Sequence, residues 1–235
     1  CVNQEDIDLG DGIVNSSSDP KKARSDVEDL VNSISTGLFA DRTIVCLTGP
    51  MNGISARNFR KDLYRDYKGN RNKPKPVLLP TVKEHIRSTF ETKIKDGLEA
   101  DDVLGILLTH PTLIPGKRIL VSTDKDLLQV PGRHFNPVHN AKRMISEAAG
   151  NRWFFTQALT GDPTDNYPGC RGIGPKKAKA LLDDTKPADW WKAIVATYEK
   201  AGLTKDDALV QARCARILQH TDYNFKRKEV ILWTP

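Results

Sequence analysis

Two short apolar runs, TIVCLT at residues 43–48 and RILVST at residues 118–123, constrain the fold of this chain most strongly. Each run is continuous and is bounded by turn-forming residues, which is typical of strands buried on both faces of a parallel sheet. Apolar residues recur at helical spacing over residues 21–38, before the first run, and again over residues 80–96, between the two runs. This alternation of strand and helix patterns predicts an α/β fold built on a mostly parallel sheet.

The rest of the chain adds loops and helices to this frame. Residues 1–20 and 133–140 are rich in polar and turn-forming residues, so we expect loops there. Helices are predicted around residues 153–159, 190–198 and 209–218, and a closing strand at residues 229–233. The aromatic side chains of the 190–198 helix are interpreted as core, not as a platform on which bases stack.

Composition narrows the setting in which the chain works. The four cysteines are widely spaced without a CxxC pattern, which favours a reducing, cytoplasmic environment over a disulfide framework or a zinc ribbon. No secretory leader is evident, no apolar run approaches the roughly 18 residues that a membrane span needs, and we expect no membrane partner. Since residue 1 is Cys1 and not Met, we expect that residues upstream have been removed or left out.

Acidic side chains form three clusters that are far apart in the sequence. Each cluster has an ordinary structural explanation, because carboxylates cap helices and complement the helix dipole. Asp124 in particular could cap a short helix that runs through Leu128. Against this explanation, three carboxylates within four residues repel one another unless a cation offsets the repulsion. The clusters are Glu99, Asp101 and Asp102 at the start of an apolar helix, Asp124 and Asp126 directly after the second apolar run, and Asp162 and Asp165.

The position and chemistry of these clusters point to a metal centre. Ligands of open α/β sheets bind beyond the carboxyl ends of the strands, where Asp124 and Asp126 are expected. Carboxylate oxygens select Mg²⁺ or Mn²⁺ over zinc, and the five histidines show no metal-ligand spacing. Two such cations about 4 Å apart can activate a water and stabilise the leaving oxygen of a phosphodiester.

A glycine hairpin follows the third acidic cluster. Gly172, Gly174 and Pro175 form a compact bend from which a helix starts, so free amides and the positive end of the helix dipole can meet a phosphate. Lys176, Lys177 and Lys179 add positive charge at the same helix start. Such a GxG bend is also common in turns that touch no ligand. Its position next to two carboxylates favours phosphate binding.

The segment from Arg57 to Pro76 is the most basic part of the chain. Its eight Lys and Arg residues alternate with aromatic residues, and that combination can neutralise phosphates and stack on unpaired bases. An ordinary solvated helix with Phe59 and Leu63 toward the core is the alternative. The formal charge of +6 agrees with a nucleic acid partner but is weaker evidence than this clustering.

Taken in order, the motifs EADD, STDKDL and GDPTDN followed by GIGPKKA resemble those of the 5'-to-3' exonuclease and flap endonuclease family. The resemblance covers nearly all of the chain from Thr43 onward. The segments NFRKDLYRDYKGNR and YNFKRKEVILWTP are most similar to the free-standing exonucleases of podovirus-type phages.

The resemblance implies a PIN-like or Rossmann-like core with a central, mostly parallel sheet, a helical arch and a helix-hairpin-helix (helix-three-turn-helix) DNA-binding subdomain. On this basis residues 1–150 are the nuclease core, with the arch at about 55–80, and residues 151–235 are the DNA-binding region with the C-terminal helices. The implied activity is divalent-metal-dependent hydrolysis of duplex DNA from the 5' end by two ions. Flap cutting, action on RNA–DNA hybrids and a monomeric state are further expectations.

The resemblance also implies a role for individual residues. Glu99, Asp101, Asp102 and Asp124 match the ligands of the tighter metal site, while Asp126, Asp162 and Asp165 match ligands toward the second. The hairpin at 172–177 would grip the duplex backbone, with K⁺ as a candidate ion on its loop carbonyls. Tyr67 is expected to stack on a frayed base. The residues matched to the catalytic arch are Arg60, Lys61, Lys68 and Arg71.

Two departures from the family pattern leave a second hypothesis open. The family supplies an aspartate on a first strand, but Asp8 and Asp11 have no apolar strand before them, and we expect that strand to lie upstream of Cys1. The strand TIVCLT is followed in the family by an aspartate, and here it ends in Thr48 and Gly49. The alternative is therefore a DNA-binding module that keeps the hairpin and arch with an impaired metal centre.

Overall fold

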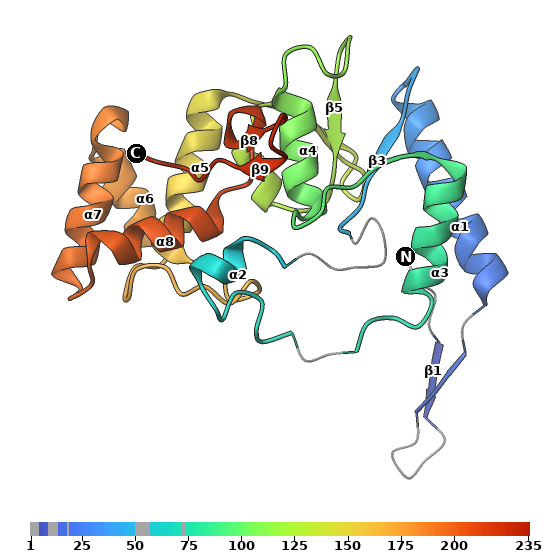
Figure 1. Ribbon diagram of the computed structural model, residues 1–235, viewed down its shortest axis with the longest axis horizontal. Helices are drawn as coiled ribbons and strands as arrows, with labels where there is room; N and C mark the ends of the chain where they lie inside the picture. Colours follow the sequence, from blue (N-terminus) through green and yellow to red (C-terminus); the bar gives the residue numbers. More distant parts are fainter. Residues whose placement is uncertain (1–4, 9–13, 18, 50–56, 72–73) are drawn as a thin grey trace. The chain divides into compact units, whose positions relative to one another are not determined.

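The computed structural model describes residues 5–8, 14–17, 19–49, 57–71 and 74–235 (Figure 1). They fall into two compact units. The first unit is formed by residues 1–47 and 72–94, and the second by residues 48–71 and 95–235. The predicted division at residue 150 follows other boundaries and stays a prediction.

The first unit pairs two helices with two short parallel strands. Helix α1 begins after Asp19, whose carboxylate accepts hydrogen bonds from the amides of Lys21 and Lys22. The buried side chains that join α1 to α3 are Ala23, Val27, Leu78, Val82 and Ile86. The elements of this unit are α1 Pro20–Gly37, α3 Leu79–Thr89, β3 Ile44–Cys46, β4 Glu91–Lys93, β1 Glu5–Asp8 and β2 Val14–Ser17.

Two predictions for this unit are wrong. The helix expected over residues 80–96 ends at Thr89, and Glu91–Lys93 pairs with β3 as a parallel strand. Phe90 is spaced from Ile86 as in a helix, but its backbone is extended, so side-chain period alone does not mark the end. The expected loop at residues 1–20 contains the antiparallel pair β1–β2 and the start of α1. Asp8 ends β1, whereas Asp11 lies outside the described residues.

The sheet of the second unit has the order β5–β6–β7. Strand β5 Ile119–Val121 confirms the second apolar run as a strand and pairs in parallel with β6 Gly132–Asn136. Strand β7 Ala141–Ile145 pairs with β6 in the antiparallel direction. The loop predicted at residues 133–140 is therefore mostly strand, with a turn at residues 137–140. The polar composition of residues 133–140 did not indicate a strand. Strand β6 forms because its backbone pairs with β5 on one side and with β7 on the other, and not because of an apolar pattern.

Helices make up most of the second unit. Helix α8 ends at Ala215, so the predicted helix over 209–218 is too long, and residues 216–219 are irregular. The predicted closing strand at 229–233 is shorter, and it pairs with β8. The elements are α2 Arg60–Leu63, α4 Ala100–Thr109, α5 Glu147–Thr160, α6 Pro175–Asp183, α7 Trp190–Lys200, α8 Lys205–Ala215, η1 Asp126–Gln129, η2 Pro187–Asp189, η3 His220–Asp222, β8 Tyr223–Asn224 and β9 Glu229–Val230.

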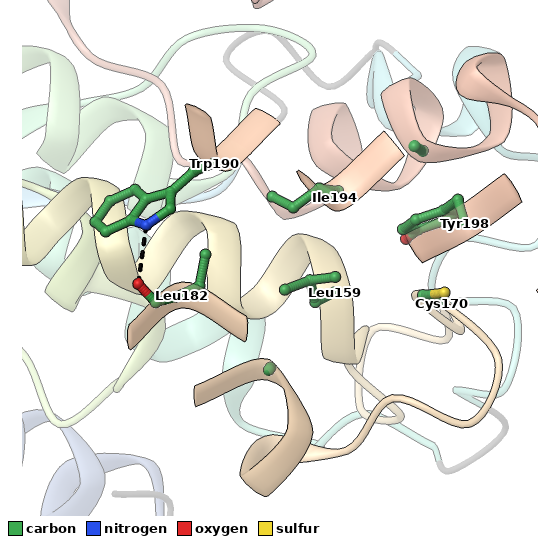
Figure 2. Packing of buried hydrophobic residues seen from close by; sticks show 8 residues of the cluster. Leu159, Cys170, Leu182, Trp190, Ile194 and Tyr198 are labelled. Carbon is green, nitrogen blue, oxygen red and sulfur yellow. Dashed lines mark hydrogen bonds between the residues drawn. The ribbon is translucent and has the colours of Figure 1, made fainter. Parts of the chain in front are cut away.

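A hydrophobic cluster holds α5, α6 and α7 together (Figure 2). Trp190, Ile194 and Tyr198 are buried, which confirms them as core side chains. The indole of Trp190 donates to the carbonyl of Leu182, 3.0 Å away, and the hydroxyl of Tyr198 donates to the carbonyl of Ala158, 2.6 Å away. Because these polar groups have partners, the large rings are buried without an unsatisfied donor. The cluster fixes the helix that follows the glycine hairpin.

Several architectural expectations stay predictions. The described parts of the proposed arch, residues 57–71 and 74–80, contain the four-residue helix α2, turns and the start of α3. Residues 55–56 and 72–73 of the same segment lie outside the described residues. The glycine bend at 172–174 does lie between α5 and α6, as a helix-hairpin-helix motif requires. No helix within the described ranges is long and apolar enough to span a membrane.

Candidate nuclease site

The acidic residues at the start of α4 have different surroundings. Glu99 caps the helix, and its own amide donates to the carboxylate of Asp102 in a capping box. The hydroxyl of Thr48, where the family pattern has an aspartate, accepts a hydrogen bond from the amide of Ala100. Asp101 is partly exposed, whereas Asp102 is fully buried.

Asp102 is paired with Arg60 inside the protein. The guanidinium donates to both carboxylate oxygens, at 2.8 and 2.7 Å, and also to the carbonyls of Cys214 and Arg216. Burial opposes the guanidinium charge, but Asp102 outweighs it and keeps the pKa of Arg60 well above its usual value. The amide of Leu218 occupies a further lone pair of Asp102.

This pair contradicts two sequence-based expectations. Arg60 has 1% of its surface exposed, so it cannot contact DNA as an arch residue. Asp102 has both oxygens committed to hydrogen bonds with protein groups, so it does not fit as a metal ligand. The spacing of EADD does not distinguish these roles, because the partner of Asp102 comes from a segment 42 residues away.

The second acidic cluster follows β5, at the expected end of the strand. The carboxylate of Asp124 accepts from the amide of Asp126, 2.8 Å away, but Lys125 is the N-cap of the short helix η1, so Asp124 does not have the capping role left open for it. Asp124 is exposed, and within the described chain its other oxygen accepts no hydrogen bond. Burial, followed by the charges of Asp124 and Asp162, raises the pKa of Asp126 to about 6. This shift shows that the second and third clusters lie close enough to repel.

A buried side-chain amide bonds the carboxylate of Asp126, and a second buried amide positions the first. The side chain of Gln157, on α5, donates to Asp126 over 2.6 Å. The side chain of Gln129 donates to Gln157 and to the carbonyl of Ala215, and it accepts from the amide of Ile217. Sequence reasoning missed both glutamines. The signal was present, because Gln157 is a polar residue inside the apolar pattern WFFTQAL.

The third cluster lies on a tightly folded loop after α5. Gly161 and Gly169 have positive φ values of 66° and 65°, and a side chain on Gly169 would come within 2.2 Å of the amide nitrogen of Gly161. Only glycine permits this approach. Asp162 pairs with Tyr167 across the loop and caps the amide of Thr164 with its carboxylate. The loop thus fixes Asp162 and Asp165 at one end of α5.

The basic segment is attached to this loop. The amide of Lys68 donates to the carbonyl of Asp165 over 2.7 Å, Asn70 donates to the carbonyl of Pro163, and Asn166 donates to that of Asp66. Lys68 has a φ of 55°, a left-handed conformation that lysine rarely adopts. Residues 66–71 are therefore held against the acidic loop by one backbone hydrogen bond and by two hydrogen bonds from side-chain amides to carbonyls.

Three side chains of the basic segment meet carboxylates from two clusters. The ammonium of Lys68 contacts Glu99 and lies 3.3 Å from Asp165, and Arg71 lies 2.7 Å from Asp165. The hydroxyl of Tyr67 lies 2.8 Å from Asp165 and 3.2 Å from Glu99. Because Tyr67 is only 2% exposed, the expectation that it stacks on a frayed base is wrong. Lys61 is exposed and points to no acidic partner in the described chain.

Carboxylates from all three clusters are electrostatically coupled. Burial, followed by the charges of Asp124, Glu99 and Asp102, raises the pKa of Asp101 to about 7. We call the following set the acidic cluster: Glu99, Asp101, Asp124, Asp126, Asp162 and Asp165. Among the described residues, no three His, Cys, Asp or Glu side chains are yet arranged around one metal position. The donors are hard oxygens whose mutual repulsion a divalent cation would relieve, so their chemistry fits Mg²⁺ or Mn²⁺.

The glycine hairpin is open to solvent. Gly172 has a φ of 79°, and a side chain at Gly172 or Gly174 would meet no atom within 4 Å. Lys176 is exposed, while Lys177 donates to the carbonyl of Gly172 and Lys179 pairs with Asp183. Exposed pairs of this kind contribute little stability, so both ammonium groups are available to exchange their partners for a phosphate.

Comparison with known proteins finds an exonuclease family and relatives that are named as exonucleases or flap endonucleases. Residues 26–155 match a family described as the 5'-3' exonuclease, N-terminal resolvase-like domain. The exonuclease of Escherichia phage T7 is 29% identical over 255 aligned residues, which cover 92% of this chain and 83% of the phage protein. A flap endonuclease Xni from Shewanella woodyi is 37% identical over 140 residues, which cover 54% of this chain and 55% of that protein.

Solved structures show the same fold. The T5 D15 protein, co-crystallized with metal ions, is 19% identical and superposes with a TM-score of 0.62, covering 83% of this chain and 87% of that one. A complex of the T5 flap endonuclease with DNA and metal ions has a TM-score of 0.60 at 19% identity and covers 82% of this chain and 84% of that one. The PIN-like α/β fold expected from the sequence is thereby confirmed, and the family description calls the matched domain resolvase-like.

Proposed function

The chain belongs to the 5'-3' exonuclease family, and we propose that its acidic cluster hydrolyses duplex DNA from a 5' end or flap. The chain is a metal-dependent 5'-3' exodeoxyribonuclease. One observation gives the strongest support for placing the reaction at the acidic cluster. Lys68 bridges Glu99 of the first acidic cluster and Asp165 of the third, so a basic segment and the carboxylates meet at one point.

Six carboxylates would hold the metal ions. We propose Glu99, Asp101 and Asp124 for one ion and Asp126, Asp162 and Asp165 for the other, with Asp102 reassigned to the pair with Arg60. Bound there, Mg²⁺ or Mn²⁺ supplies an activated water and neutralises charge on the scissile phosphate. Gln157 orients the carboxylate of Asp126 through its hydrogen bond.

The cationic side chains bind and position the substrate. Lys68 and Arg71 both reach Asp165, so a phosphate next to the acidic cluster lies within reach of the two cations. The exposed guanidinium of Arg71 can pair with two phosphate oxygens, and Lys68 offers a single charge. Lys61 is exposed near this segment and is proposed to attract the strand without touching the reacting phosphate.

We propose that the glycine hairpin binds the duplex at a distance from the bond that is cleaved. Its open backbone at Gly172 and Gly174, the start of α6 and the side chains of Lys176, Lys177 and Lys179 would all face phosphates. A K⁺ ion on the loop carbonyls, activity on RNA–DNA hybrids, a monomeric state and a cytoplasmic location remain part of the proposal.

A cleavage assay tests the function directly. With Mg²⁺ and a 5'-end-labelled duplex, we expect release of labelled mononucleotides or short oligonucleotides. Asp124→Asn should abolish release and keep DNA binding, because it removes one ligand charge and leaves the hairpin unchanged. Binding without release by the unmodified protein would instead support the alternative of a DNA-binding module, and full activity of Asp124→Asn would exclude its role as a ligand.

A further inference from the structure

A further group of cations lies on the turn between β8 and β9. The turn runs from Phe225 to Lys228, and its residues Lys226, Arg227 and Lys228 are all exposed. We call these three residues the basic turn. In the part of the chain that the structure describes, none of their side chains pairs with a carboxylate, although Glu229 follows directly.

The backbone of the basic turn is fixed. The side-chain oxygen of Asn224 accepts from the amides of Lys226 and Arg227, each at 3.0 Å. The strands on either side pair Tyr223 with Val230, and the ring of Phe225 packs edge-on against His110 at 4.9 Å between centroids. Cations held on a fixed backbone lose less conformational entropy when they bind than cations on a loose loop.

Lys228 occupies a backbone conformation that does not suit lysine. Its φ is 58°, in the left-handed region where glycine and asparagine are favoured and where the side chains of other residues cause strain. Left-handed residues other than glycine that persist despite this strain cluster at functional sites. Lys68, whose φ is 55°, is such a residue in the candidate nuclease site.

Repulsion between neighbouring cations also destabilises the basic turn. The ammonium of Lys95 lies over the ring of Tyr223, 4.2 Å from its centroid. Burial and the nearby charge of Lys228 lower the pKa of Lys95, so the cations in this region repel one another. A turn selected for stability alone would contain a neutral residue with a left-handed preference at position 228 and fewer like charges.

We propose that the basic turn, together with Lys95, is an additional phosphate-binding surface that contacts the backbone of duplex DNA. The basic turn is separate in sequence from the acidic cluster and from the glycine hairpin, whereas Lys95 lies four residues before Glu99. The inference rests on the proposed function, which supplies a long polyanion as the partner. Lys and Arg side chains bind phosphates whatever the DNA sequence, so the contact is nonspecific and salt-dependent.

Lys228→Asn separates the binding role from a structural one. The substitution removes a charge and places a residue that suits a positive φ, so the melting temperature should stay constant or rise. The dissociation constant for duplex DNA should rise by about threefold to tenfold, and the slope of log K against log salt should fall by about 0.9. A lower melting temperature, or unchanged DNA affinity, would overturn the proposal.

A triple substitution with a matched control tests the whole surface. Lys226→Gln, Arg227→Gln and Lys228→Asn together should reduce the salt slope by about 2–3. The control removes the same charge from three other exposed lysines, through Lys186→Gln, Lys192→Gln and Lys200→Gln. Its slope should stay unchanged. Equal losses in the two triple variants would show an effect of net charge only and would refute the basic turn as a site.

Binding is measured by fluorescence anisotropy on duplex DNA in EDTA, and the salt concentration is varied. This measurement does not require cleavage, so it remains informative if the nuclease activity is absent. Single-turnover cleavage at saturating DNA with Mg²⁺ is measured in parallel and should be the same for the basic-turn variant and the unmodified protein. A slower chemical step at saturation would mean that the basic turn acts in catalysis and not as a separate surface.

Discussion

The guanidinium of Arg60 and the carboxylate of Asp102 form a fully buried ion pair with two hydrogen bonds, at 2.8 and 2.7 Å. Arg60 also donates to one carbonyl in the last turn of α8 and to one directly after it, while Asp102 lies in the first turn of α4. The pair therefore joins the basic segment, the helix that carries Glu99 and Asp101, and the end of α8. We infer that its role is to position the acidic cluster.

Removing Arg60 should destabilise the protein strongly. Arg60→Met leaves the charge of Asp102 buried without a partner, which costs about 3–5 kcal/mol in the free energy of unfolding. Urea denaturation measures this loss. Lys61→Met, at the exposed neighbouring position, is the control and should change stability by less than about 0.5 kcal/mol. If both variants unfold at the same urea concentration, the buried pair is not a structural hub.

Arg60→Lys should give an intermediate loss. Lysine keeps the positive charge, but it lacks the planar fork that bonds both oxygens of Asp102 and the two carbonyls. The same urea titration measures the difference. A variant as stable as the unmodified protein would show that charge alone matters at this position.

Substitution of Gln157 should weaken metal binding more than it weakens folding. Gln157→Leu removes the hydrogen bond that orients Asp126, and loss of such a partner lowers metal affinity by about 10-fold to 100-fold. Calorimetric titration with Mn²⁺ measures this affinity, and thermal unfolding reports stability separately. Trp190→Phe is the control, since it also removes a buried hydrogen bond, to the carbonyl of Leu182, but from α7, which carries none of the proposed metal ligands. Equal affinity losses in both variants would contradict the positioning role.

Lysines of the glycine hairpin should carry part of the salt dependence of DNA binding. Lys176→Ala combined with Lys177→Ala removes two phosphate contacts, so the salt slope should fall by about 1.8. Affinity should fall at every DNA sequence alike, because these contacts do not read bases. An unchanged slope would mean that the hairpin does not touch phosphate.

The thiol of Cys214 should report on opening of the Arg60–Asp102 region. Burial raises the pKa of Cys214 to about 12, so at pH 8 the group stays protonated and shielded. A thiol reagent at pH 8 should therefore label Cys214 only after urea unfolding. In Arg60→Met, labelling of Cys214, followed by peptide mass spectrometry, should become at least several-fold faster. Rapid labelling in the unmodified protein would contradict the buried position of this residue.

Sequence patterns were sufficient for the parts of the fold with strong local signals. The apolar runs at 43–48 and 118–123 are strands, and the helical patterns led to α1, α5 and α7 within a few residues at most ends. The strands β4 and β6 were missed. Their residues are polar or continue a helical spacing, and their strand conformation depends on pairing with β3 and with β5 and β7.

The sequence by itself determined the chemistry of the site: hard carboxylate donors, a glycine bend with lysines, and a basic segment, all in one order along the chain. The tertiary structure decided which of these groups are available. It buried Asp102 against Arg60, buried Tyr67 next to the carboxylates, and placed the side chain of Gln157 within hydrogen-bonding distance of Asp126. The physical reason is that burial and pairing arise from segments distant in sequence, so the same residue type can be a ligand, a hidden counter-ion or a support.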